Sequence, residues 1–223
     1  VLGDVYKRQD YARGWNGEAF RVRSPKESII QSQPKIIEPK NNNVNNPYIV
    51  DKKRINSKSY RDNFELLPYK SKVNDALHRE AINCFNASNG RNVERLALID
   101  ARNGKTIGYS VGTENSNKVI ISKPTGYTRD NSIVIIHNHP NNSGFSRADI
   151  DTYIKMPQIH GAIVVTGNGK IYSVSSIDRD KPIERAFKMF YNIYEETYGL
   201  HRASDMALKD LHRKGWLIYE KRE

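Results

Sequence analysis

The sequence predicts an α/β fold in which helices flank a mixed β-sheet. Helical and strand patterns alternate along the chain, as in sheets covered by helices. The apolar run Ile133–Ile136 does not alternate with polar residues, which is typical of a strand buried on both faces. Two turns, Asn103–Gly104 and Gly167–Asn168–Gly169, separate strand-like segments and predict antiparallel hairpins.

The first expected element is a helix over residues 69–87, which carries apolar residues at a spacing of four (Val73, Leu77, Ala81 and Phe85) and stops at Asn89–Gly90. Strands are then expected over 93–100, 106–111, 118–122 and 132–137, a helix over 146–155, and strands over 160–166 and 170–175. Pro182 fits the first turn of a helix that ends before Gly199, and a last helix is expected over 203–214.

Composition limits the class of protein. The 223 residues carry a formal net charge of +11, and only 37% of them are hydrophobic. Apolar runs are a few residues long, so neither a membrane-spanning helix nor a membrane partner is expected. The single cysteine, Cys84, excludes an internal disulfide and fits a reducing compartment. Lysines and arginines are spread without one dominant block, so nucleic acid is the less favoured partner.

The chain divides into four expected regions. Residues 1–9, VLGDVYKRQ, resemble a translated sequencing adapter, and we expect them not to belong to the protein. Residues 10–60 are polar and proline-containing and are expected to form an extended arm or linker. Residues 61–178 are expected to form the α/β domain, and residues 179–223 a C-terminal helical extension.

The segment SIVIIHNHPNNSGFSRAD, residues 132–149, predicts a metal site. Alternate side chains of a strand share a face, so His137 and His139 point the same way and Asn138 points the other way. A loop can fold Asp149 back toward the two imidazoles. Zinc accepts this ligand set, and three protein ligands with one open position are typical of a catalytic site. We therefore expect Zn²⁺ as the cofactor.

Structural explanations compete with this hypothesis. The two histidines could be polar residues at a strand end that bond loop backbone. Ser146 and Asp149 have the spacing of a capping box, in which serine caps a helix and an acid three residues later reaches back. The capping box and metal ligation are compatible, because a capped helix would also hold Asp149 in place.

The motif resembles the JAB/MPN (JAMM) metalloprotease superfamily over residues 91–176. Its elements stand here as Glu94, His137-Asn138-His139-Pro140 and Ser146-Arg147-Ala148-Asp149, and this version is most similar to the RadC-like and prophage branches. INSKSYRDNFELL, residues 55–67, is similar to a segment that precedes this domain in some phage head-morphogenesis proteins. The resemblance implies a cytidine-deaminase-like α/β sandwich.

It also implies roles for the residues. His137, His139 and Asp149 would hold zinc, Glu94 would act as general base and acid, and Ser146 would donate to the oxyanion. Glu114 is the alternative to Glu94. Nine residues separate His139 from Asp149, one fewer than in the common family pattern, which leaves a distorted or inactive site as an alternative.

The favoured function is a zinc-dependent hydrolase that cleaves peptide or isopeptide bonds, of phage or mobile-element origin, with a protein or peptide as substrate. The alternatives are a RadC-like DNA-associated protein, and a structural phage head or accessory protein with a vestigial site. We expect a cytoplasmic location in a bacterial host, or association with a virion. The sequence does not indicate an oligomeric state or a specific substrate.

Overall fold

The computed structural model describes residues 11–13, 19–22, 48–113 and 126–223. The adapter-like residues 1–9, the expected strand over 118–122 and Glu114 lie outside the described residues. Among the described residues, none of the helices is both long and apolar enough to cross a membrane.

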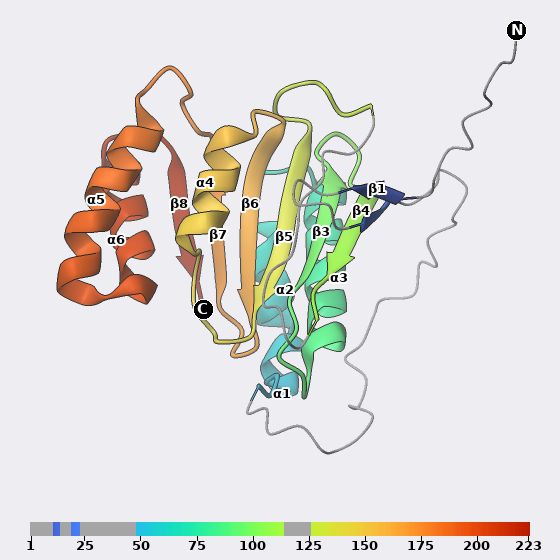
Figure 1. Cartoon of the computed structure of the whole chain (residues 1–223). Helices are drawn as coiled ribbons and strands as arrows, with labels where there is room; N and C mark the ends of the chain where they lie inside the picture. Colours follow the sequence, from blue (N-terminus) through green and yellow to red (C-terminus); the bar gives the residue numbers. More distant parts are fainter. Residues whose placement is uncertain (1–10, 14–18, 23–47, 114–125) are drawn as a thin grey trace, which may run out of the picture.

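One mixed sheet forms the centre of the fold (Figure 1). Its strand order is β1-β2-β4-β3-β5-β6-β7-β8. The bounds are β1 (Tyr11–Arg13), β2 (Ala19–Val22), β3 (Arg95–Asp100), β4 (Thr106–Val111), β5 (Ile133–His139), β6 (Ile159–Thr166), β7 (Ile171–Ser175) and β8 (Ile218–Arg222). The neighbours β5 and β6 are parallel, and the other neighbouring strands pair antiparallel. The fold is therefore mixed α/β, as the sequence predicts.

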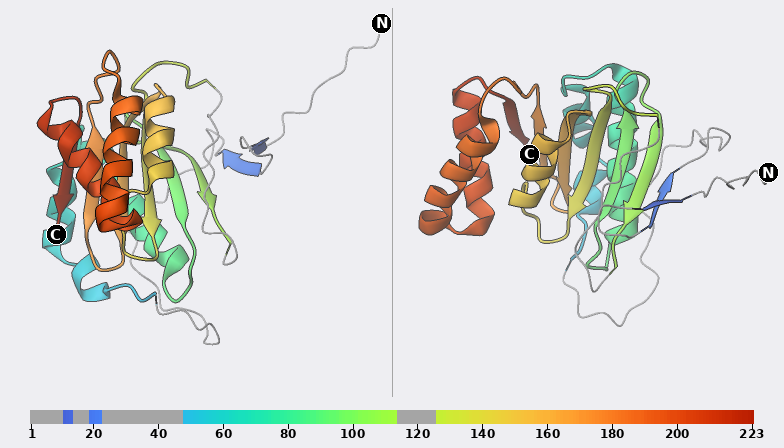
Figure 2. Two further views of the ribbon diagram at one scale, coloured as in Figure 1. Left: turned by 60° about the vertical axis from the view of Figure 1, so that its left-hand side comes forward. Right: turned by 45° about the horizontal axis from the view of Figure 1, so that its top comes forward.

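Helices cover both faces of the sheet (Figure 2). One face carries α1 (Lys52–Ile55), α2 (Lys58–Glu65) and α3 (Ser71–Ser88), and the other carries α4 (Arg147–Lys155), α5 (Ile183–Tyr198) and α6 (Leu200–Arg213). Strand β5 supplies both cores: Ile133 and Ile135 pack on the α4–α6 side, and Val134 and Ile136 on the α3 side. All of its residues are buried, as its unbroken apolar run predicts.

Most expected elements are confirmed to within a few residues, including the helices over 69–87 and 146–155 and the hairpins.

Gly104 shows why one turn needs glycine. Its φ is +73°, and a Cβ there would lie 2.1 Å from the carbonyl oxygen of Lys72. The turn after β3 can therefore lie directly against the start of α3.

Two segments differ from the expectation. Residues 48–60 belong to the expected arm, yet Tyr48, Ile55 and Tyr60 are buried in the α3-side core, and the segment contains α1 and the start of α2. The C-terminal extension is not only helical, because β8 pairs with β7 and extends the sheet. Neither segment has an apolar repeat strong enough to be recognised alone, because the rest of the fold supplies its packing partners.

A buried ion pair joins α3 to the start of β3. The Arg95 guanidinium lies 2.8 Å from the Glu80 carboxylate, and their side chains are 8% and 1% exposed. The Thr106 hydroxyl and the Asn83 amide also donate to Glu80, at 2.7 and 3.1 Å. Burial would raise the pKa of Glu80, but Arg95 and these donors hold it below its ordinary value. The pair fixes the strand that begins beside Glu94.

Candidate metal centre

The C-terminal end of β5 presents two imidazoles to the N-terminal end of α4. His137 and His139 continue the face of Ile133 and Ile135, so both rings lie on the α4 side of the sheet. Both histidines are 5% exposed, and their Nε2 atoms lie 3.0 Å apart. The parity of the strand thus brings together the two residues that the sequence singled out.

Asp149 reaches the same point from the first turn of α4. Its Oδ1 lies 3.3 Å from His137 Nε2, and its Oδ2 lies 3.4 Å from His139 Nε2. The expected capping box is present: the Asp149 backbone N–H donates to Ser146 Oγ at 3.2 Å, and the Ser146 N–H donates to Asp149 Oδ2 at 2.7 Å. The cap therefore orients the carboxylate that faces the histidines.

The loop between His139 and Asp149 closes despite its short length. Phe145 anchors it in the core at 4% exposure, and Asn142 adopts a φ of +57°. The Gly144 carbonyl accepts from His139 Nδ1 at 2.8 Å. This bond places a proton on Nδ1 and leaves the Nε2 lone pair of a neutral ring free to face His137 and Asp149.

The three side chains fit a zinc ion in kind and in spacing. His137, His139 and Asp149 offer ligand atoms that all lie within 4.8 Å of one another. Tetrahedral zinc with bonds of about 2.0–2.1 Å separates its ligand atoms by about 3.3 Å. The distance between the two Nε2 atoms, 3.0 Å, and the distances from them to the Asp149 carboxylate oxygens, 3.3 and 3.4 Å, bracket that value. Imidazole nitrogen and carboxylate oxygen are both ordinary zinc donors.

The charges of the three groups are coupled. Burial would raise the pKa of Asp149, but the two imidazoles beside it hold that pKa well below its ordinary value. Burial would lower the pKa of His139, yet Asp149, Glu94 and the Gly144 carbonyl raise it. Asp149 is therefore an anion beside the two rings, as a metal ligand must be.

Glu94 lies on the same face as the histidines. It precedes β3, where Leu96 pairs with His137 and packs on the α4 side. Continuing this register places Glu94 opposite His139. Burial raises the pKa of Glu94, and it interacts electrostatically with both histidines and with Asp149. The structure thus brings Glu94 near the three candidate ligands without making it one of them, and Glu114 is not among the described residues.

Asn138 has a structural role that the sequence does not reveal. Its side chain is fully buried on the opposite face of β5. Its Oδ1 accepts from the Arg95 N–H at 2.8 Å, and its Nδ2 donates to the Val93 carbonyl at 3.1 Å. These bonds hold the backbone on either side of Glu94 to the strand that carries both histidines. Bonds from a side chain to distant backbone leave no sequence pattern that could have predicted them.

Replacing Asn138 with alanine is expected to lower stability by about 1–3 kcal/mol, because two buried backbone groups lose their partners. Urea denaturation measures this loss, and metal analysis of the same variant is expected to show a wild-type zinc content. A variant as stable as the wild type would mean that the backbone beside Glu94 does not depend on Asn138.

No family model, curated protein or solved structure matches the chain.

Proposed function

We propose that this chain is a zinc-dependent hydrolase of the JAB/MPN type, with the corresponding cytidine-deaminase-like sandwich fold, and that it cleaves peptide or isopeptide bonds. The observation that carries the proposal is the convergence of His137, His139 and Asp149 from two adjacent elements, with the Glu94 carboxyl nearby on the same face. Origin from a phage or mobile element is part of the proposal and rests on the sequence resemblance.

His137, His139 and Asp149 would hold the ion and leave one position open. Bound zinc would lower the pKa of a water ligand to about 7 and polarise the substrate carbonyl. Glu94 would accept a proton from the attacking water and return it to the leaving amine nitrogen, so that no net proton remains on the enzyme. The new carbon–oxygen bond would form first and give a tetrahedral intermediate, and the carbon–nitrogen bond would break as Glu94 returns the proton to the amine nitrogen.

Ser146 would support the oxyanion of the tetrahedral intermediate. Its Oγ accepts the Asp149 N–H in the capping box, and this bond leaves the hydroxyl hydrogen free to donate. Capping and oxyanion binding therefore do not compete for the same lone pair or hydrogen. The same serine would orient a ligand and stabilise developing charge.

The deciding experiment uses the zinc-loaded chain and two substrate pools. One pool contains linear peptides from a digested proteome, and the other contains peptides branched through a lysine isopeptide bond. Mass spectrometry identifies the new ends. Glu94→Gln is expected to lose about 10²–10⁴-fold in rate, because it cannot transfer the proton, while it keeps its zinc. Glu65→Gln, an exposed change on α2, serves as the matched control.

Three outcomes would contradict the proposal in different ways. A wild type that holds zinc but cleaves neither pool would overturn the hydrolase function. Cleavage that persists at full rate in Glu94→Gln would remove Glu94 from the mechanism. Salt-dependent DNA binding that survives Glu94→Gln, without cleavage of either pool, would favour the DNA-associated alternative.

A further inference from the structure

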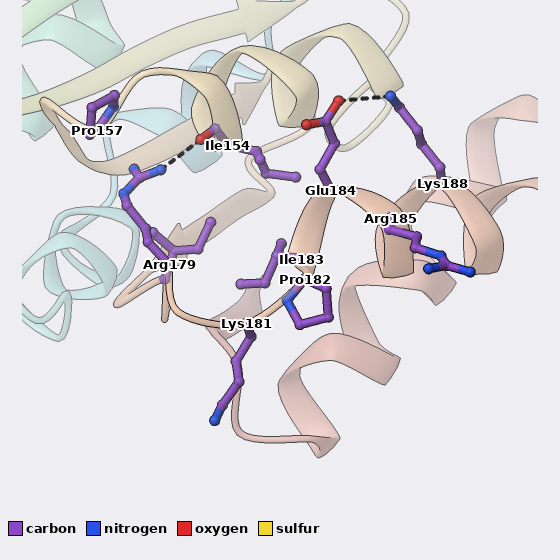
Figure 3. Close-up of a pocket in the computed structure, with 10 residues that line it drawn as sticks. Ile154, Pro157, Arg179, Lys181, Pro182, Ile183, Glu184, Arg185 and Lys188 are labelled. Carbon is purple, nitrogen blue, oxygen red and sulfur yellow. Dashed lines mark hydrogen bonds and ion pairs between the residues drawn. The ribbon is translucent and has the colours of Figure 1, made fainter.

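A cavity lies at the opposite end of α4 from the candidate metal centre. It has a volume of about 720 Å³, is open to solvent, and lies between the end of α4 and the start of α5. Helix α4 has nine residues, so this end lies about 13 Å along the helix from the Ser146 cap. Figure 3 shows Ile154 and Ile183 facing the space between the two helices. The apolar part of the lining consists of Ile154, Pro157, Ile177, Pro182 and Ile183.

The rim of the cavity is strongly cationic. Arg179, Lys181, Arg185 and Lys188 line it, against the single carboxylate of Glu184. Glu184 is already paired, because Lys188 lies 2.7 Å from it and Lys155 lies 3.9 Å from it. In Figure 3 the charged ends of Lys181 and Arg185 extend outward at the rim. A ligand at this mouth would therefore meet net positive charge.

The cationic side chains at the rim differ in how strongly other groups of the protein already hold them. The Arg179 guanidinium donates to the carbonyls of Ile154 at 2.7 Å and of Tyr153, Met156 and Ile159 at 3.2–3.3 Å, so it closes the end of α4. Lys181 lies 3.9 Å from Asp178, its one ion-pair partner in the part of the chain that the structure describes. Arg185 is exposed and pairs with no carboxylate among the described residues. Arg185 is therefore available to an anion, and Lys181 could turn to one at the loss of a single 3.9 Å contact.

The N-terminal turn of α5 also affects the electrostatic potential at the cavity. This 16-residue helix starts at the cavity, and no side chain caps its N-terminus. The helix dipole favours negative charge at this end, but the Ile183 N–H already donates to the Lys181 carbonyl at 2.8 Å and the Glu184 carboxylate already lies in the first turn. The apolar lining and the cations Lys181 and Arg185 together favour a ligand that is both acidic and apolar.

We propose that this cavity docks an acidic protein segment that inserts an apolar side chain. Carboxylates would lie at Lys181 and Arg185, and an aliphatic side chain would contact Ile154 and Ile183. A protein segment fits better than nucleic acid, because the lining holds no aromatic ring on which a base could stack. The cavity lies outside the metal centre, so the proposal does not depend on the hydrolase function.

Fluorescence anisotropy with labelled peptides tests the proposal on the full chain. The probe is a nonapeptide of alternating glutamate and leucine, and the two comparison peptides replace glutamate by lysine or leucine by serine. The wild type is expected to bind the probe, and Lys181→Glu/Arg185→Glu is expected to bind it about tenfold or more weakly, because two attractive rim charges become repulsive. Lys70→Glu/Lys72→Glu makes the same charge change at the start of α3 and is expected to bind like the wild type.

The comparison peptides and variants test the charge of the ligand and its apolar side chains separately. Equal binding of the serine peptide would overturn the apolar part of the proposal. Equal weakening by Lys70→Glu/Lys72→Glu would mean that only net charge is sensed, and would overturn the site itself. Tighter binding of an oligonucleotide of matched charge, lost in Lys181→Glu/Arg185→Glu, would overturn the choice of a protein segment. None of these results depends on zinc or on cleavage, so failure here leaves the proposed hydrolase function untouched.

Discussion

Replacing His139 with alanine is expected to abolish zinc binding. The wild-type chain should take up about one zinc ion, because three protein donors converge at one point. Without His139 the remaining donors are one imidazole and one carboxylate, and His137 also loses the ring that lies 3.0 Å from its own Nε2. Asp149→Ala should have the same effect. Atomic absorption after dialysis measures the zinc content.

Thermal unfolding supplies an independent readout that needs no substrate. Zinc at about one hundred times its dissociation constant would stabilise the wild type by about 2.7 kcal/mol, since it binds the folded chain. This gain should vanish in His139→Ala and Asp149→Ala. His160→Ala is the matched control, because that imidazole lies on β6 against Tyr69, with ring centroids 5.5 Å apart. If the wild type takes up no zinc after reconstitution, the metal centre and the hydrolase proposal both fail.

The second large effect is expected at the buried ion pair. Arg95→Met should lower the free energy of unfolding by about 3–5 kcal/mol, because it leaves the Glu80 carboxylate buried without its cation. The double variant Glu80→Leu/Arg95→Met should recover most of that loss, because no charge then remains buried. Lys58→Met is the control. It breaks an ion pair of 2.7 Å whose lysine side chain is 86% exposed, and it should cost far less stability than Arg95→Met because solvent screens the pair.

The same pair predicts the acid sensitivity of the fold. The folded pKa of Glu80 lies below its ordinary value of 4.5, so the stabilisation from its ionised form is fully present above that pH. It is lost as the pH falls through the depressed pKa. Urea denaturation at several pH values should show a shallower acid limb in Glu80→Leu/Arg95→Met than in the wild type. Identical acid limbs would mean that this carboxyl does not control the transition.

The spacing of apolar residues along the sequence was enough to predict those elements whose own apolar residues form an unbroken run or one helix face. Strand β5 and helix α3 were predictable because Ile133–Ile136 and the four-residue repeat of α3 carry the signal within their own sequence. Strand β8 was not predictable, because IYEKR is mostly polar and joins the sheet only by pairing with β7. Residues 48–60 were missed for a related reason, since Tyr48 and Ile55 are buried by elements distant in sequence.

Local sequence patterns likewise predicted some residues of the candidate site and not others. Strand parity and the capping spacing placed His137, His139 and Asp149 correctly beside one another. Glu94 came from the resemblance, because no local pattern distinguishes it from other glutamates at strand starts. The supporting contacts of Asn138 and Gly144 involve backbone atoms, whose partners depend on the folded register and not on residue type.

The candidate metal ligands lie close together in the sequence, and this affects the order in which the metal centre forms during folding. His137 and Asp149 are twelve positions apart, so bringing them together closes a short segment at a small entropic cost. Glu94 is more than forty positions away and reaches the site only after β3 has paired with β5. A nascent or partly unfolded chain could therefore capture an ion through β5 and α4 before it can transfer protons. If the chain is the hydrolase proposed above, cleavage would therefore begin only once β3 has paired with β5 and brought Glu94 to the site.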